Sequence, residues 1–170
     1  MAITYKKIAS ATVGASGATG ITFSAIPSGY TDLVILASLR STRGGGNVAD
    51  IRAEFNGSST GYTAKRLYGD GSSAGSDNSL ASLGNAASQT ASTFSSHYFY
   101  IPNYTSSNNK TFSLDSAQEN NATGAYVTMS AYLWSNTAAI TSVLVRDFSD
   151  GNTNNLVQYS TATLYGILKA

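Results

Sequence analysis

The chain contains a single histidine, His97, so a Ser–His–Asp triad or an imidazole base would have to use it. His97 opens the segment His97-Tyr-Phe-Tyr-Ile101, whose two-residue period places His97, Phe99 and Ile101 on one face of a strand. No Gly-x-Ser-x-Gly elbow is placed between a strand and a helix, where α/β-hydrolases carry their nucleophile. We therefore expect His97 to be a strand or interface residue.

The carboxylates also give little indication of catalysis, because glycosidase chemistry needs two of them facing each other at a set separation. The only glutamates are Glu54, which alternates outward on a predicted strand, and Glu119, which lies in a predicted turn. Neither has a carboxylate partner that the sequence would bring close. We expect a protein that is not an enzyme.

Oxygen ligands at a calcium-like spacing occur in the segment from Asp147 to Asn155, where Asp147, Asp150 and Asn152 are the candidates. The segment lacks the downstream glutamate of an EF-hand loop and lies between predicted strands. Asp and Asn residues in a turn that contains glycine usually bind their own backbone. We expect no cofactor, and calcium at these three residues remains the alternative.

Tyrosine is the remaining signal, because eleven tyrosines are too many for one core. A tyrosine ring gives a large, rigid contact area with a polar tip, which suits protein interfaces, and it also stacks on sugars. We expect a contact surface that includes five of these residues: Tyr62, Tyr68, Tyr98, Tyr100 and Tyr104.

Composition limits the partners. Charged residues make up 11% of the 170 residues, against roughly 25% in an average protein. The net charge of +1 gives no basic surface for nucleic acid. Cysteine is absent, which excludes disulfides and zinc–thiolate sites. No apolar run approaches the ~20 residues of a membrane helix, and no secretory signal opens the chain, so we expect synthesis in a cytoplasm and no membrane partner.

The elements that would position these residues are predicted strands, separated by turns rich in Gly and Asn. Leu33-Val-Ile-Leu36 is apolar on both faces and should be buried deepest. Residues 71–93 should form a long Ser/Gly-rich loop, with a short helix as the alternative. The predicted strands are 5–13, 20–25, 32–40, 49–56, 65–69, 93–101, 111–116, 125–133, 139–147 and 161–168.

About ten short strands with no fixed period predict one domain over residues 1–170. The fold class is all-β: an antiparallel two-sheet β-sandwich of the jelly-roll type. On the last strand, Leu164 and Tyr165 should face opposite ways, with Tyr165 serving the fold. Gly166 should let a neighbouring ring or backbone approach closely.

Four phrases resemble small structural proteins of tailed bacteriophages, in the same order and over nearly the whole chain. The resemblance implies a virion component with a β-sandwich fold, assembled as a homotrimer, and it carries over no catalytic residues. The phrases are Ile21-Thr-Phe-Ser-Ala-Ile-Pro-Ser-Gly-Tyr-Thr-Asp-Leu-Val-Ile35, Phe55-Asn-Gly57, Tyr98-Phe-Tyr-Ile-Pro-Asn-Tyr104 and Ser160-Thr-Ala-Thr-Leu-Tyr-Gly-Ile167.

Two functions fit this resemblance. As a capsid decoration or cement protein, the chain would bind the major capsid protein and stabilise the head of the virion. As a tail-fibre or spike domain, it would bind a glycan on the host surface. A single short domain without a coiled-coil or repeat shaft favours the first function, and the expected location is the virion after synthesis in the bacterial host cytoplasm.

Overall fold

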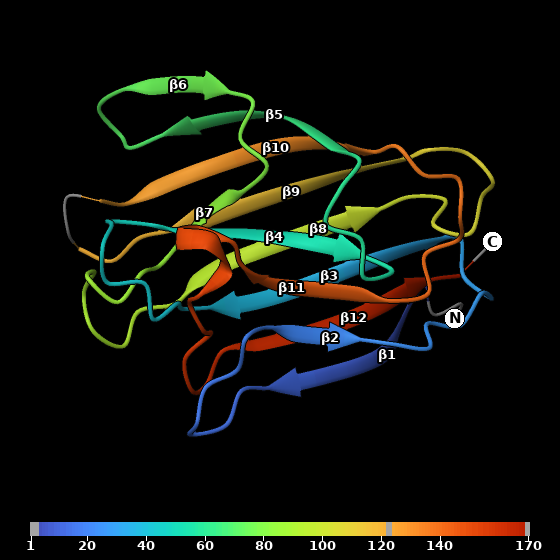
Figure 1. The fold of residues 1–170 in the computed structure, drawn as a ribbon, viewed down its shortest axis with the longest axis horizontal. Coiled ribbons are helices and arrows are strands. Elements are labelled where there is room, and N and C mark those ends of the chain that lie inside the picture. Colours follow the sequence, from blue (N-terminus) through green and yellow to red (C-terminus); the bar gives the residue numbers. More distant parts are fainter. Residues whose placement is uncertain (1–3, 122–123, 169–170) are drawn as a thin grey trace.

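The computed structural model describes residues 4–121 and 124–168, and it shows two antiparallel sheets packed face to face (Figure 1). The expected all-β sandwich is confirmed. No helix in the described ranges is long and apolar enough to cross a membrane. The strands are β1 (Tyr5–Thr12), β2 (Ile21–Phe23), β3 (Asp32–Leu39), β4 (Ala49–Phe55), β5 (Tyr62–Gly69), β6 (Ala74–Asp77), β7 (Ser82–Gly84), β8 (Ser95–Ile101), β9 (Lys110–Gln118), β10 (Tyr126–Trp134), β11 (Val143–Asp147) and β12 (Thr161–Ile167).

The strand order is that of a jelly roll with an extension. The sets β1-β12-β3-β8 and β2-β11-β4-β7 form the two facing sheets of the jelly roll. The strands β9, β10, β5 and β6 then continue the first set, which gives an eight-stranded sheet opposite a four-stranded one. Figure 1 shows the extension at the top, with β5 and β6 above β10.

Each predicted strand overlaps an observed one, but the expected long loop at 71–93 is wrong in part. Two short strands, β6 and β7, lie within it, and neither has the apolar alternation that marks a strand in sequence. β6 pairs with β5 at the edge of the large sheet, whereas β7 pairs with β4 in the small sheet. The alternative of a short helix there is also wrong, because residues 71–93 contain no helix.

The core lies between the sheets. Leu33, Val34 and Ile35 are buried as expected, but Leu36 is 45% exposed, so the prediction is wrong for that residue. Leu36 points away from the four-stranded sheet, and its neighbours on that side do not cover it. On β4, the predicted alternation is confirmed, because Ile51, Ala53 and Phe55 are buried and Arg52 pairs with Glu54 on the other face.

Arg40 organises the segment that follows β7. Its side chain is buried, and its guanidinium donates hydrogen bonds of 2.8–3.2 Å to the carbonyl oxygens of four residues in that segment. A guanidinium offers five N–H donors in a fixed fork, so a single side chain can donate hydrogen bonds to several backbone carbonyl groups at once. The four residues are Ala87, Gln89, Thr90 and Thr93.

The sheets approach each other closely beside β7, where small polar residues replace large apolar ones. The Ser82 hydroxyl bonds the Ser116 hydroxyl across the interface at 2.7 Å and also bonds Thr128. A Cβ added to Gly84 would lie 2.8 Å from the Ile51 side chain. One end of the interior is therefore polar and tightly packed, while the other end is apolar.

Gly166 confirms the close approach that the sequence predicts. A Cβ at this position would lie 2.3 Å from Cγ of Tyr30, whose ring packs against the last strand. Leu164 is fully buried, whereas Tyr165 lies half-buried on the opposite face of the sheet, so the predicted register of β12 is also confirmed.

Replacing Gly166 with alanine should lower the free energy of unfolding by about 2 kcal/mol, because the new methyl group forces Tyr30 out of its position. Gly14→Ala is the matched control, since nothing lies within 4 Å of a Cβ there. Denaturant unfolding of the two variants measures the difference. Equal stability would show that the ring of Tyr30 is not held against β12.

Candidate functional site

His97 and Ser95 form the one arrangement that resembles a nucleophile and its base. Nε2 of His97 lies 2.8 Å from the Ser95 hydroxyl. Both side chains are buried, and burial lowers the pKa of His97 to about 3. Ser95 is also bonded to the Leu39 carbonyl and to the amide N–H of Asn85. Because both residues are sealed from solvent, a substrate cannot reach this pair, and its geometry serves the packing of β7 against β8.

The two glutamates lie apart and are engaged separately. Glu54 is held by the guanidinium groups of Arg52 at 2.9 Å and Arg146 at 3.6 Å on the four-stranded sheet. Glu119 accepts a hydrogen bond from the backbone N–H of Asn121 in the turn after β9. They therefore do not form a facing pair of the kind that glycoside hydrolysis uses.

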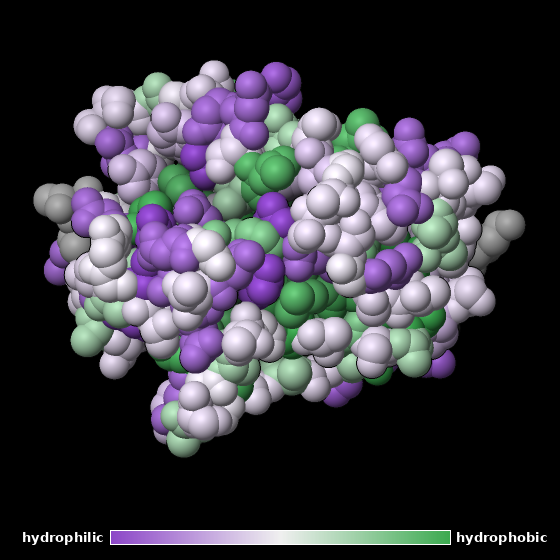
Figure 2. Space-filling model, in the orientation of Figure 1, coloured by the Kyte–Doolittle hydropathy of each residue, from purple (hydrophilic) through white to green (hydrophobic). Residues whose placement is uncertain are grey.

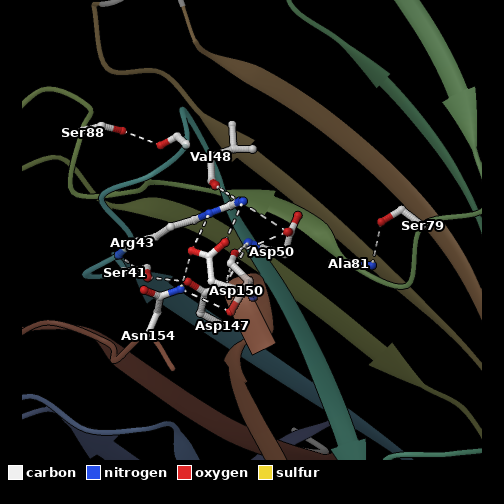
Figure 3. Close-up of polar contacts among 12 residues, drawn as sticks. Ser41, Arg43, Val48, Asp50, Ser79, Ala81, Ser88, Asp147, Asp150 and Asn154 are labelled. Carbon is white, nitrogen blue, oxygen red and sulfur yellow. Dashed lines mark hydrogen bonds and ion pairs between the residues drawn. The ribbon is translucent and has the colours of Figure 1, made fainter. Parts of the chain in front are cut away.

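Asp147 does not present its carboxylate to a cation. Its oxygens accept hydrogen bonds from the Ser41 hydroxyl and from the backbone N–H groups of Ser149 and Asp50 (Figure 3). In the ranges 4–121 and 124–168, no group of three or more His, Asp or Glu side chains has the arrangement of a metal site.

Arg43 supplies the positive charge beside this cluster. Its guanidinium lies 3.4 Å from Asp50 and 3.3 Å from Asp150 (Figure 3). Asp150 also accepts a hydrogen bond from the Asn154 amide, and Asn152 sits in the same turn with a φ of 68°. Asp150 and Asn152 thus belong to an ion-paired turn whose polar groups bond within the chain.

The five tyrosines selected from the sequence do not form one surface. Tyr104 lies fully buried in the core, where its hydroxyl bonds the Pro27 carbonyl, so it offers no contact area to a partner. Tyr62 stacks on Trp134 on the inner side of the sheet, and Tyr68 packs against Tyr126 there.

Tyr98 and Tyr100, in contrast, lie on the outer face of the eight-stranded sheet, the face turned away from the four-stranded sheet. Tyr98 is 37% exposed, and the hydroxyl of Tyr100 bonds the Asp32 carboxylate at 2.9 Å. Tyr165 lies on the same face, with its ring 6.4 Å from the ring of Tyr5. Of the five selected tyrosines, only Tyr98 and Tyr100 therefore lie together on the outer face.

Exposed apolar side chains gather on this outer face. Met129 is 63% exposed, Val127 is 66% exposed and Leu67 is 60% exposed. Of the large hydrophobic side chains that are exposed in the described ranges, only Tyr159 and Leu168 lie elsewhere. The members on the outer face are Tyr5, Leu36, Leu67, Tyr98, Val127 and Met129.

Strand register aligns several of these residues into a row across the sheet. Leu67 of β5 pairs with Met129 of β10, which pairs with Asp115 of β9. Asp115 pairs with Tyr98 of β8, which pairs with Leu36 of β3. Exposed apolar surface of this extent on a folded domain marks a contact site.

The opposite side of the molecule has a different character. Figure 2 shows hydrophilic residues gathered over β4 and the turn after β11, where Arg43, Asp50 and Asp150 form their ion pairs. Hydrophobic residues also show on this side, near the place of β11, between the hydrophilic groups. The two sides of the sandwich are thus chemically distinct, and the outer face of the large sheet is the candidate site.

The sequence contained a signal for this face. The segment 126–134 has apolar residues on both faces, which predicts a central strand, and β10 does lie inside the sheet between β9 and β5. Sequence alone did not show that one of those faces has no covering layer. That information depends on the number of layers in the fold, which strand alternation does not reveal.

The buried His97 should make the fold sensitive to acid. The pKa of about 3 in the folded state lies below the usual 6.5, so the unfolded chain binds the extra proton and stability is lost as the pH falls below 6.5. At pH 5 the loss from this residue is about 2 kcal/mol relative to pH 7. Urea unfolding at both pH values should show a smaller loss for His97→Gln than for the wild type, and parallel losses would contradict the burial of a neutral imidazole.

No family model matches the chain, and no curated protein or solved structure matches it either.

Proposed function

We propose that this chain is a structural protein of a tailed-phage virion, a capsid decoration protein that acts through protein contacts. One observation carries the proposal: the outer face of the eight-stranded sheet has a row of exposed apolar residues that nothing within the described part of the chain covers. A face of this kind is buried in the functional state of a protein, because its exposure to water is unfavourable.

The polar groups of the chain support a structural role. The Ser95–His97 pair is sealed, Asp147 is saturated with donors, and Glu54 is held by two arginines. Each of these groups stabilises the fold and is therefore engaged before any substrate arrives. The four phrases that resemble phage structural proteins supply the link to a virion.

A host-glycan receptor domain is the second candidate, and one observation favours it. A groove of about 700 Å³ runs along the large sheet beside Tyr100 and Pro102, and Lys65, Asn78 and Thr111 also line it. An aromatic ring beside hydroxyl, amide and ammonium groups suits a saccharide. The same groove would suit a protein side chain, so the particle experiment below decides between the two.

Purified protein should bind phage heads that lack it, saturably, and should not bind isolated tails. Met129→Glu should weaken head binding by a factor of ten or more, because the carboxylate would be buried on the outer face without a partner. Ser107→Glu, at an exposed position in the turn after β8, is the matched control and should bind as the wild type does. Sedimentation of labelled protein with heads or tails measures both.

Binding to tails or to host envelope in place of heads would move the assignment to the glycan-binding alternative. Head binding that Met129→Glu leaves unchanged would show that the outer face is not the surface in use.

A further inference from the structure

We propose that a second copy of this chain covers the outer face, with the two copies related by a two-fold axis lying between their large sheets. The inference rests on the proposed function and deepens it, because it names a second copy as the molecule that covers the outer face. The dimer is then the form that binds the head, and Met129→Glu weakens head binding by separating the two copies. It differs from the homotrimer that the resemblance implies, and the experiment below separates the two.

The size of the face suits such a dimer. Eight strands spaced about 4.8 Å apart, each rising about 3.3 Å per residue over about eight residues, cover roughly 900 Å². A standard protein interface takes about 800 Å² from each partner. The outer face is therefore large enough to form a stable contact by itself.

Two opposite charges beside β10, those of Lys65 and Asp115, lack an ion partner within the described part of the chain, as do Lys7 of β1 and Asp32 of β3 farther along the same face. Lys65 lies on β5 beside Ala131, and its ammonium group bonds only the Asn78 amide oxygen, at 2.6 Å. Asp115 lies on β9 beside Met129, and its Oδ1 is buried with no hydrogen-bond partner. Burial also raises the pKa of the Asp115 carboxyl.

A two-fold axis resolves both charges at once. Lys65 and Asp115 flank β10 on opposite sides, and their partners on β10, Ala131 and Met129, are neighbours on the same face. An axis in the plane of the interface, passing between the two charges, places Lys65 of each copy opposite Asp115 of the other. Such an isologous contact repeats every interaction twice, so the unpaired acid and the unpaired base on either side of β10 are self-complementary.

Hollows on the same face would receive side chains of the second copy. One, of about 480 Å³, lies among Lys65, Leu67, Asn78 and Met129. Another, of about 430 Å³, lies beside Leu36, Tyr98 and Tyr165. Exposed Met129 and Leu67 are of a size to fill hollows of this kind, and methionine adapts its shape readily.

The two edge strands of the large sheet, β1 and β6, are poorly suited to pairing with another chain, which favours association through the outer face. β1 carries Lys6 and Lys7 and a bulge between Lys7 and Ala9, both of which discourage pairing with another strand. At the other edge, β6 is only four residues long. Association by strand addition is thus opposed at both edges, while the face carries no such protection.

Analytical ultracentrifugation at micromolar concentration tests the inference. The wild type should sediment as a dimer of 17.6 kDa chains. Lys65→Asp and Asp115→Lys should each raise the dissociation constant ten-fold or more, and the double variant should return it to within about three-fold of the wild type, because the swapped pair faces across the same axis. Lys6→Asp, on the edge strand β1, is the matched control and should not change it.

Thermal unfolding of each variant checks that it folds. If a charge variant does not fold, Met129→Glu replaces it in the test and should likewise raise the dissociation constant of the dimer. A monomer at these concentrations, a trimer, or single variants that dimerise as well as the wild type would overturn the inference. If the protein does not dimerise but still binds heads, the dimer is contradicted and the proposed function stands. If the protein dimerises but does not bind heads, the proposed function is contradicted and the dimer stands.

Discussion

A two-layer fold leaves one face of each sheet without a covering layer, and most of the features of this molecule follow from that constraint. A two-layer sandwich buries the inner face of each sheet, and the jelly-roll strands β1-β12-β3-β8 receive their cover from β2-β11-β4-β7. The extension β9-β10-β5-β6 widens one layer without widening the other. Its outer face continues that of the jelly roll, so the apolar row from Leu67 to Leu36 remains in water until another molecule covers it.

On the inner side of the large sheet, polar contacts join the two sheets beside β7. β7 lies directly against the large sheet, where Ser82, Ser116 and Thr128 join their hydroxyls and Gly84 leaves room for Ile51. The guanidinium of Arg40 donates hydrogen bonds to four carbonyl groups in the segment between β7 and β8 and so holds that segment in place. A buried polar network is stabilising only when its members are satisfied, and here the serine and arginine donors largely meet that condition.

The sequence predicted the fold better than the site, for reasons that particular residues make clear. Two-residue alternation located β4 and β12, and Gly166 indicated a close approach that Tyr30 makes. The strands β6 and β7 were missed because their Ser and Gly residues have low strand propensity. β6 is held by pairing with β5 and by the ion pair of Arg66 with Asp77, and β7 by pairing with β4 and by the Ser82–Ser116 hydrogen bond. Leu36 was expected to be buried but is exposed, because alternation shows which residues share a face and does not show which face is covered. Tyr104 lies in the turn after β8, where alternation gives no information, and its ring is buried in the core.

Methionine oxidation measures the central claim, burial of the outer face in the assembled protein, most directly. Met129 is the only methionine in the described ranges, and its side chain is exposed in the isolated chain. Peroxide converts an exposed methionine to the sulfoxide, and burial slows that reaction. Oxidation of Met129, followed by peptide mass spectrometry, should be ten-fold or more slower in the assembled protein than in the chain diluted to nanomolar concentration. Equal rates in both states would contradict the account.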